Sequence, residues 1–401
     1  MREHKILNLQ ETCTGCFACM NVCPKDAITL PEKFEGFYYP EIDKDRCIDC
    51  SLCDKVCPQI TKQPTTTMRK AYYGWAKDDV VRKASSSGGM FHILAADVIN
   101  NGGVVYGASF NYDGIIRWEC HSTRQVPIVD LQKSKYVQNY VGLAFREIKK
   151  DLQTGNPVLF CGTPCQAAGL RSFLREVYPN MIVVDFICHG VPSMSLLRLH
   201  LEYLGIKNIK TIDFRPKNRA WVDDLDIYFF KKQSARPTEI QLYRTPWSFD
   251  EYFYMFETYK STRRSCRSCN YCNGQRSADI TLADFWGIKK YKPEEFDTKG
   301  ISLVISNTKF GDSIIDRLSV GHDAIMKPLP LEYAAYVYER VRTSHDSPYQ
   351  NSLRDKILEE IYSIGYKPTL IKYRLKVRKM TLLRNCIHTY LSNIKHKLLH
   401  H

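Results

Sequence analysis

The chain has 401 residues, of which 57 are lysine or arginine and 43 are aspartate or glutamate, so its formal net charge is +14. Its hydrophobic content of 44% is that of an ordinary soluble protein with a hydrophobic core, and its length allows two or three domains. No segment approaches the roughly 18–20 apolar residues of a membrane span, which excludes a membrane-spanning channel or transporter. The charged N-terminus is followed by no apolar segment, so we expect no signal peptide and a cytoplasmic location.

Two copies of one cysteine pattern lie near the N-terminus. The first copy is Cys13, Cys16, Cys19 and Cys23, and the second is Cys47, Cys50, Cys53 and Cys57. Each run reads Cys-x2-Cys-x2-Cys-x3-Cys-Pro, which is the spacing of bacterial ferredoxins with two iron–sulfur clusters. In such ferredoxins three thiolates of one run bind a cluster, and the fourth cysteine binds the cluster of the other run.

The spacing therefore predicts two 4Fe-4S clusters with crossed ligands. Cluster 1 is expected on Cys13, Cys16, Cys19 and Cys57, and cluster 2 on Cys47, Cys50, Cys53 and Cys23. A zinc site would use pairs of cysteines or mixtures with histidine, and a disulfide framework does not predict two identical runs. With short strands expected at 27–30 and 38–42, residues 1–62 are predicted to form an α+β ferredoxin-like domain that moves single electrons.

Alternating strands and helices begin at about residue 71, after a polar linker at 61–67. We expect a helix over 91–101, strands over 104–108, 115–118, 158–160 and 182–186, and strand-rich segments over 211–231 and 280–306. The strands at 158–160 and 182–186 are each followed by a loop and a helix. Two such units predict an α/β domain, placed at 71–345, with ligands at the carboxyl ends of its strands.

Seven short motifs follow one another in this second domain. They are SSSGGM at 85–90, GGVVYG at 102–107, SKYVQN at 134–139, FCGTPCQ at 160–166, DFICHGVPS at 185–193, SCRSC at 265–269 and RSADITLADFWG at 276–287. The ordered set resembles the beta-subunit family of coenzyme F-420 (deazaflavin) hydrogenases and dehydrogenases. The resemblance extends over about residues 10–310, and it implies an iron–sulfur oxidoreductase with an α/β flavin-binding domain.

The family resemblance implies that this domain holds FAD. The candidate flavin-binding residues are Ser86, Ser87, Gly88, Gly89, Gly162 and Thr163. The first four precede a helix, whose free N–H groups suit a phosphate, and glycines let the backbone approach it closely. A serine or threonine that only caps the helix is the other interpretation of both segments.

The resemblance also implies a third metal site. Its four candidate ligands are Cys165, Cys188, Cys266 and Cys269, which recur in the family's motifs and would hold a third 4Fe-4S cluster. Buried free cysteines, or zinc at Cys266 and Cys269, remain open. His189, beside Cys188, is a candidate catalytic proton donor because histidine titrates near neutral pH; a histidine that hydrogen-bonds within its own loop is the alternative.

The end of the chain is strongly basic. No acidic residue follows Glu360, whereas nine lysines and arginines do, interleaved with leucine and isoleucine at near-helical spacing. Residues 346–401 are therefore predicted to form a basic helical extension. It could contact an anionic membrane surface, dock on an acidic partner or pack on its own domain. No groove-reading motif is present, so no nucleic acid is expected.

These patterns predict an iron–sulfur flavoprotein oxidoreductase. The ferredoxin-like domain would exchange single electrons with a ferredoxin-type carrier or a partner redox subunit, and the flavin would convert them into a hydride-equivalent pair. The pair would pass to or from a deazaflavin or an organic substrate, and proteins of this shape resemble accessory enzymes of surface-polysaccharide pathways. A non-catalytic electron-transfer subunit of a larger complex is the main alternative, and an iron–sulfur redox sensor is a weaker one.

Overall fold

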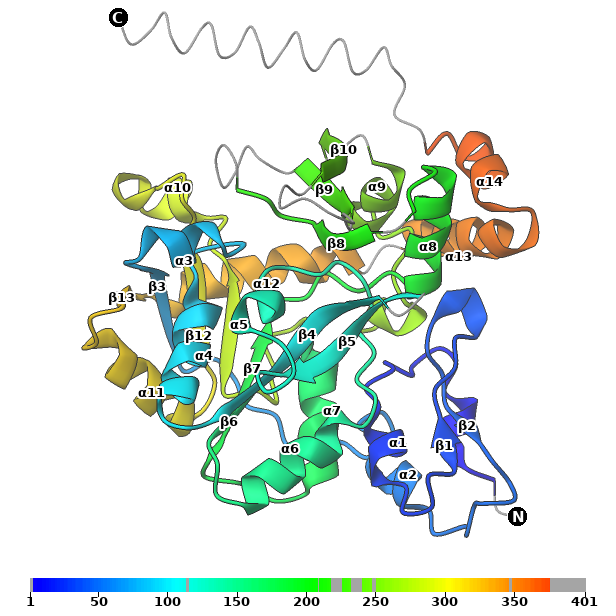
Figure 1. The fold of residues 1–401 in the computed structure, drawn as a ribbon, viewed down its shortest axis with the longest axis horizontal. Helices are drawn as coiled ribbons and strands as arrows, with labels where there is room; N and C mark the ends of the chain where they lie inside the picture. The colour runs from blue at the N-terminus through cyan, green and yellow to red at the C-terminus, as the bar shows by residue number, and fades with distance from the viewer. Residues whose placement is uncertain are drawn as a thin grey trace, which may run out of the picture.

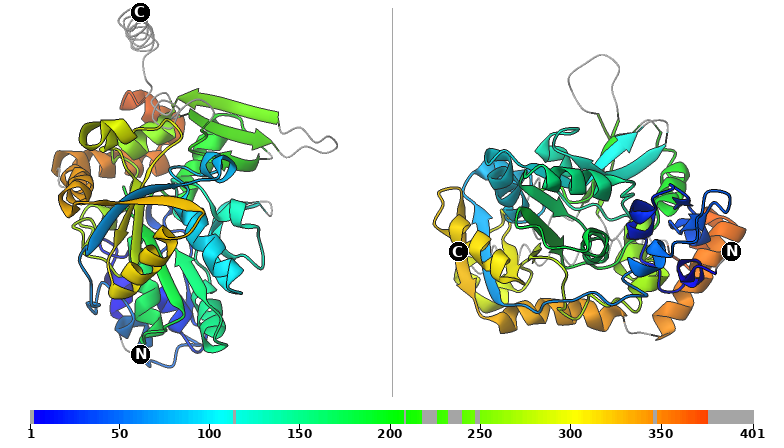
Figure 2. Two further views of the ribbon diagram at one scale, coloured as in Figure 1. Left: turned by 90° about the vertical axis from the view of Figure 1, so that its left-hand side faces the viewer. Right: turned by 90° about the horizontal axis from the view of Figure 1, so that it is seen from below.

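A small N-terminal unit lies against one end of a larger α/β body (Figure 1). The computed structural model describes residues 3–112, 115–207, 209–217, 226–231, 240–246, 250–345 and 348–375, and every structural statement here concerns these residues. In Figure 1 and in the right-hand view of Figure 2, the N-terminal unit lies at one end of the molecule. The strands β3 (Lys70–Ala76) and β13 (Ala324–Leu329) lie at the other end.

The N-terminal unit is built on an internal repeat. Its elements are η1 (Lys5–Asn8), α1 (Ala18–Val22), β1 (Ile28–Thr29), η2 (Phe34–Gly36), β2 (Glu41–Ile42) and α2 (Leu52–Lys55). The strands pair antiparallel, with Ile28 opposite Ile42. Phe17 and Ser51 hold the same place in the two cysteine runs, and both adopt a left-handed conformation, with φ of 68° and 58°. The repeat seen in the sequence is therefore a repeat of backbone geometry, and the short expected strands are present.

The body is organised around an eight-stranded mixed sheet in the order β13-β3-β12-β11-β7-β6-β4-β5. Its further strands are β4 (Val104–Tyr112), β5 (Ile116–Ser122), β6 (Val158–Cys161), β7 (Met181–Phe186), β11 (Ile280–Asp284) and β12 (Ser302–Ser306). The pairs β4–β6, β6–β7 and β7–β11 are parallel, and the other four pairs are antiparallel. The strand–loop–helix units predicted at 158–160 and 182–186 thus form the parallel centre of the sheet.

Helices cover both faces of this sheet. They are α3 (Asp79–Lys83), α4 (Met90–Asn100), α5 (Ile128–Leu131), α6 (Ala144–Gln153), α7 (Pro164–Leu174), α11 (Lys309–Ser319) and α12 (Leu331–His345). Side chains of α4 and α11 share a core with one face of the sheet, which includes Val184. The opposite face, which includes Val183, shares its core with α6, α7 and the N-terminal unit. Adjacent residues of β7 therefore lie in two different cores, because successive side chains of a strand point to opposite faces of the sheet.

The N-terminal unit and the body share one hydrophobic core. Phe17 and Tyr38 of the unit lie in the same buried group as Phe145 of α6 and Leu170 of α7. Polar contacts reach the cysteine segments directly: Arg146 of α6 donates a hydrogen bond to the carbonyl oxygen of Cys23 (2.5 Å). Ser172 of α7 donates one to the carbonyl oxygen of Val56 (2.7 Å). The α/β body thus fixes the position of the loops on which clusters are predicted.

A helical subregion joins distant parts of the chain. It contains α8 (Met194–Tyr203), α9 (Glu251–Glu257), α13 (Pro348–Ser363) and α14 (Tyr366–Lys372), beside a small sheet of β8 (Ile209–Asp213), β9 (Asp226–Lys231) and β10 (Ile240–Pro246). Buried residues of α13 and α14 pack against α8 and α9. The first part of the predicted C-terminal extension is therefore helical and belongs to the folded body. Its basic segment from 376 to 401 lies outside the described residues.

The remaining short elements are η4 (Arg264–Cys266), α10 (Ile288–Tyr291) and η5 (Pro293–Glu295). No helix in the described part of the chain has both the length and the hydropathy to cross a membrane. The structure agrees with the predicted fold class in its coarse form, a ferredoxin-like N-terminal region followed by an α/β body. The predicted domain boundaries at 62, 71 and 345 stay predictions.

Candidate metal centres and cofactor site

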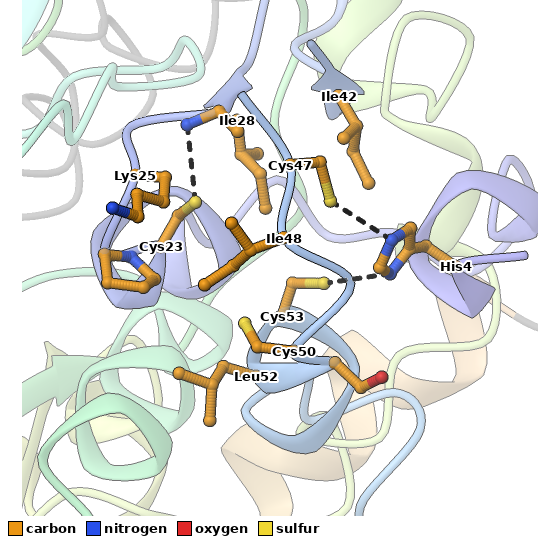
Figure 3. Close-up of a pocket in the computed structure, with 13 residues that line it drawn as sticks. His4, Cys23, Lys25, Ile28, Ile42, Cys47, Ile48, Cys50, Leu52 and Cys53 are labelled. Atoms are coloured by element: carbon orange, nitrogen blue, oxygen red, sulfur yellow. Dashed lines mark hydrogen bonds between the residues drawn. The ribbon is translucent and has the colours of Figure 1, made fainter. Parts of the chain in front are cut away.

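Four cysteines from both runs line one pocket of the N-terminal unit (Figure 3). Cys23 comes from the first run, whereas Cys47, Cys50 and Cys53 come from the second. This is the crossed grouping expected of the ligands of cluster 2. The side chains of Ile28, Ile42, Ile48 and Leu52 complete the pocket and would shield the cluster from water. Because Cys50 is exposed, this centre lies at the surface of the protein.

His4 belongs to this centre, although the sequence analysis did not single it out. The imidazole is buried, with Nε2 3.4 Å from Cys47 Sγ and Nδ1 3.6 Å from Cys53 Sγ (Figure 3). Its Nε2 is also 3.3 Å from a carboxylate oxygen of Asp49. A ring N–H of His4 can therefore donate to a thiolate of cluster 2. No spacing rule marks a single histidine that lies nine residues before the first cysteine.

The thiols expected to hold cluster 1 also lie together. Burial raises the pKa of Cys16, and the thiolates of Cys57 and Cys13 raise it further. Burial likewise raises the pKa of Cys57 to about 11, with a further rise from the Cys13 thiolate. Cys57 of the second run therefore lies in the electrostatic field of the first run, as the crossed assignment requires. Iron binding would replace these protons, because thiolates are the ligands of the cluster.

The structure also gathers the third cysteine group: Cys165, Cys188, Cys266 and Cys269. Cys165 lies in the first turn of α7 and Cys188 in the loop after β7, at the carboxyl ends of two parallel strands. Burial raises the pKa of Cys188, and the thiolates of Cys266 and Cys165 raise it further. A hydrogen bond with Cys272, followed by burial, raises the pKa of Cys269. Four neighbouring half-buried thiols fit a metal centre, and Cys272 is a further thiol at this place.

Helix α7 connects the third cysteine group with cluster 1. A Cβ atom built on Gly169 would lie 2.8 Å from Cys16 Cβ and 2.9 Å from its Sγ. Cys165 precedes Gly169 by four residues and so lies on the same face of the helix. Tyr271 is buried between the two thiol groups: burial raises its pKa first, and then Cys165 and Cys16 do. Only a residue without a side chain permits this close approach of the Cys16 loop to α7.

The predicted flavin loop is held firmly inside the protein. Ser86 Oγ accepts a hydrogen bond from Ser134 N (2.8 Å), and Ser87 Oγ donates one to the Ile301 carbonyl (2.8 Å). The N–H of Gly88 donates to Ser302 Oγ (2.9 Å), while Gly89 takes the N-cap position of α4 with φ of 94°. These contacts hold the loop against the start of β12, and Gly89 caps α4. Its role in flavin binding stays a prediction.

Gly162 and Thr163 lie at the carboxyl end of β6. Thr163 forms a capping box with Gln166, in which the Thr163 N–H donates to Gln166 Oε1 (3.1 Å) and the Gln166 N–H donates to Thr163 Oγ1 (3.4 Å). Thr163 Oγ1 is also 3.1 Å from Cys165 Sγ. These two predicted flavin residues therefore adjoin the third cysteine group directly.

Two half-buried lysine side chains, Lys135 and Lys217, lie close to the flavin loop. Lys217 Nζ donates to the carbonyl oxygens of Arg82 and Lys299, each at 2.8 Å, and to that of Ser87. Lys135 Nζ donates to the carbonyl of Gln132. Burial lowers the pKa of both lysines to about 7. The three N–H donors of Lys217 are all used by these carbonyls, whereas Lys135 has further N–H donors, which suit a phosphate of a dinucleotide.

Arg215 is paired within the same region. Its Nη1 lies 3.0 Å from a carboxylate oxygen of Asp284 and 3.1 Å from the Tyr136 hydroxyl, and its guanidinium stacks on Trp286. Arg215 thus forms an internal ion pair with Asp284.

His189 is placed in the loop after β7, beside Cys188. Its Nδ1 is 2.9 Å from the hydroxyl of Tyr259, and the two rings stack with centroids 4.0 Å apart. Phe256 packs edge-on against the imidazole, with ring centroids 4.9 Å apart. These contacts orient the ring, and its catalytic role stays a prediction.

Comparison with known proteins identifies the two parts of the chain. Residues 155–330 match the family described as the C terminus of the coenzyme F420 hydrogenase/dehydrogenase beta subunit. Residues 12–60 match the 4Fe-4S dicluster domain. Residues 155–330 thus belong to this beta-subunit family, and the chain also carries an N-terminal dicluster domain. The family resemblance expected from the motifs is thereby confirmed, as is the iron–sulfur character of the N-terminal region.

Curated relatives match short parts of this chain. One subunit of the H2:CoB-CoM heterodisulfide,ferredoxin reductase of Methanothermobacter marburgensis is 41% identical over 64 residues, which is 12% of this chain and 9% of the relative. A 7Fe ferredoxin of Hydrogenibacillus schlegelii is 44% identical over 52 residues, which is 12% of this chain and 60% of the relative. The chain thus spans less than two thirds of either.

A structural match is found in the F420-reducing [NiFe] hydrogenase complex of Methanosarcina barkeri. It covers 77% of this chain and 97% of the matched chain, with 15% sequence identity and a TM-score of 0.46.

Proposed function

We propose that this protein is an iron–sulfur flavoprotein oxidoreductase. It exchanges single electrons with a ferredoxin-type carrier or a partner redox subunit, and exchanges a hydride-equivalent pair with a second partner. The observation that carries the proposal is the succession of three cysteine groups. The cluster 2 pocket reaches the surface at Cys50, the cluster 1 thiols are half-buried and adjoin α7, and the third group lies beyond Gly169 at the carboxyl ends of β6 and β7.

The surface at cluster 2 suits the approach of an electron carrier. Ile48 is 56% exposed beside the exposed Cys50, so an apolar contact there would bring a partner's redox centre close to cluster 2. By contrast, Cys16 meets the backbone of α7 and so faces the interior of the protein. We therefore place single-electron exchange with the carrier at cluster 2.

The opposite end of the succession is where we place FAD. Lys135 would bind its phosphates beside Ser86, and Lys217 would hold the loop in place through the Ser87 carbonyl. Gly162 and Thr163 would separate the flavin from the third cysteine group. When bound, the flavin would supply the conversion between single electrons and hydride pairs. The matched family is named for coenzyme F420, which makes a deazaflavin the first candidate for the pair partner. An organic substrate, such as one of surface-polysaccharide biosynthesis, is the second.

A non-catalytic electron-transfer subunit is the second candidate function. The observation that favours it is the internal use of the loop donors: Ser87 Oγ, the Gly88 N–H and the Thr163 cap are all bonded within the protein. In that case the loops only cap helices, and the pair chemistry belongs to a partner.

The location that we propose is the cytoplasm, because a reducing compartment keeps thiols available to iron. A contact between the basic C-terminal segment and an anionic membrane surface or an acidic partner is a further proposal, and it concerns residues beyond 375.

The metal and flavin content of anaerobically purified protein tests these proposals. About eight irons with matching acid-labile sulfide and one flavin would support the flavoenzyme, and about twelve irons would add a third cluster. Zinc in place of the additional irons would assign the third cysteine group to zinc. Eight irons without flavin, even after incubation with FAD, would refute the enzyme and leave the electron-transfer subunit.

Two lysine variants make the flavin test specific. Lys135→Met and Lys217→Met should lower the flavin content severalfold while the iron content stays unchanged. Lys299→Met is the matched control, because its ammonium forms an exposed ion pair with Asp79 (2.8 Å). Full flavin content in both test variants would place the phosphates elsewhere.

A further inference from the structure

The Arg263 side chain lies between the cluster 1 loop and the third cysteine group and is fully buried. Its Nε donates to the carbonyl oxygen of Cys13 (2.6 Å), and its Nη2 donates to that of Tyr38 (2.9 Å). Its backbone carbonyl accepts a hydrogen bond from the N–H of Cys266 (3.0 Å). One residue thus contacts a predicted ligand of cluster 1 through its side chain and a member of the third cysteine group through its main chain.

Every hydrogen-bond partner of this guanidinium is uncharged. Besides the two carbonyls, Nη1 donates to the amide oxygen of Gln138 (3.4 Å). Among the described residues, no carboxylate oxygen lies within 4.0 Å of the Arg263 side chain. The neighbouring arginines differ: Arg264 pairs with Glu11 (2.5 Å), and Arg267 pairs with Asp355 (2.8 Å). Arg263 is therefore a buried cation without a protein counter-charge in the described structure.

A buried charge of this kind needs compensation. The rings of Tyr39 and Phe37 face the guanidinium, 4.1 and 5.3 Å from its central carbon, and their π-electrons supply part of it. An arginine does not lose its proton in a protein, so it cannot neutralise itself as a buried lysine does. An uncompensated buried ion costs several kcal/mol of stability. The missing negative charge must therefore come from a group that binds nearby.

A cubane cluster with four thiolate ligands supplies this charge. It is anionic, and its negative charge grows by one when it is reduced. A positive charge close to a cluster favours the reduced state, because that state is the more negative one.

Cluster 2 has carboxylates beside its thiols, and the guanidinium of Arg146, which donates to the Cys23 carbonyl, is paired with Asp26 (2.6 Å). His4 contacts Asp49, and Asp54 accepts a hydrogen bond from the Ile6 N–H (3.0 Å). A carboxylate oxygen of Asp49 lies within 4.8 Å of Cys47 Sγ, and one of Asp54 lies within 4.8 Å of Cys53 Sγ. Negative neighbours disfavour the additional electron on cluster 2, whereas a positive neighbour favours it on cluster 1.

We propose that Arg263 is a positioning residue whose fixed charge raises the reduction potential of cluster 1 above that of cluster 2. An electron donated by a reduced ferredoxin-type carrier at cluster 2 then moves inward: cluster 2 is oxidised as cluster 1 is reduced, and no proton is required. The proposal rests on the iron–sulfur part of the proposed function and does not depend on the flavin.

Two variants remove the net charge in different ways. Arg263→Gln deletes it. Gln138→Glu keeps Arg263 but gives Nη1 a carboxylate partner at the position of the present amide oxygen, with almost no change in shape. Arg263→Lys keeps the positive charge but loses the planar guanidinium that donates to both carbonyl oxygens. Arg267→Gln is the matched control in the same turn, because that arginine is already paired with carboxylates.

The measurement is an anaerobic redox titration of the iron-loaded protein, followed by electron paramagnetic resonance. In Arg263→Gln and in Gln138→Glu, the ratio of reduced to oxidised cluster 1 at a fixed potential should fall at least tenfold, which is 59 mV for a one-electron couple. Cluster 2 should shift much less, and Arg263→Lys and Arg267→Gln should remain within about threefold of the parent at both centres.

The proposal is overturned if Gln138→Glu retains full iron content and both midpoint potentials stay unchanged. If Arg263→Gln fails to hold iron, Gln138→Glu decides alone, because it leaves the contacts of Arg263 to Cys13 and Tyr38 in place. Failure of the proposed function gives a different result, namely a parent protein with fewer than two clusters or a fully loaded protein without flavin.

Discussion

Replacing Gly169 by alanine tests the contact between α7 and the cluster 1 loop. Within a helix this change normally stabilises, because glycine is about 1 kcal/mol less favourable than alanine in a helix interior. The sequence alone therefore predicts a more stable protein. The tertiary structure predicts the opposite sign, since the space that a methyl group would need is occupied by Cys16.

The magnitude follows from three distances. The new Cβ would lie 2.8 Å from Cys16 Cβ, 2.9 Å from Cys16 Sγ and 3.3 Å from the Cys16 carbonyl oxygen. Carbon atoms in good contact are about 3.5–4.0 Å apart, so the loop must move by roughly 1 Å. Overpacking of this kind costs about 1–3 kcal/mol, which outweighs the gain in helix propensity. We expect a net destabilisation of up to about 2 kcal/mol, concentrated at cluster 1.

The assay combines denaturant unfolding of the reconstituted protein with the rate of iron loss to a chelator, both without oxygen. Gly169→Ala should unfold at a lower denaturant concentration and lose the iron of cluster 1 several times faster than the parent. Gly107→Ala in β4 is the matched control, because its new Cβ would make only ordinary contacts, the nearest at 3.6 Å to Leu131 Cβ. A Gly169→Ala protein that is more stable than the parent and keeps both clusters would refute the reasoning.

Three further predictions follow from single contacts. Combining Cys57→Ser with Cys16→Ser should remove about four irons relative to the parent, because both are predicted ligands of cluster 1, whereas uncrossed ligand sets would remove about eight; iron and sulfide analysis decides. Tyr366→Phe should lower the free energy of unfolding by about 1–2 kcal/mol, because it removes the hydroxyl 2.9 Å from Nδ1 of the buried His200; an unchanged denaturation midpoint would contradict this. Burial lowers the pKa of Lys135 to about 7, against 10.5 when exposed, so the unfolded chain holds more protons above pH 7 and stability should rise with pH by at most about 1.4 kcal/mol per unit. Unfolding at pH 7 and pH 9 should show this rise in the parent and a smaller one in Lys135→Met, and equal slopes would disprove it.

The sequence by itself determined the iron–sulfur part of the protein. Three of the four ligands predicted for each cluster lie within seven residues, so their convergence is a property of a local loop that spacing alone reveals. Local periodicity likewise predicted β6, α7 and β7, because the hydrophobic pattern of a strand or helix is contained within the element. The ordered motifs then identified the family, which the match to residues 155–330 confirms.

Only the tertiary structure decided how these parts are joined and charged. Gly169 meets Cys16 from more than 150 positions away, and Arg263 meets the Cys13 carbonyl from 250. No local pattern marks either residue, because the contact exists only after the N-terminal unit packs on α6 and α7. The same holds for His4 at cluster 2 and for Gly88, whose N–H is taken by Ser302. The spacing of the cysteine ligands is a local property of the sequence. The close approach of α7 to the Cys16 loop and the uncompensated charge of Arg263 arise only when distant segments pack together.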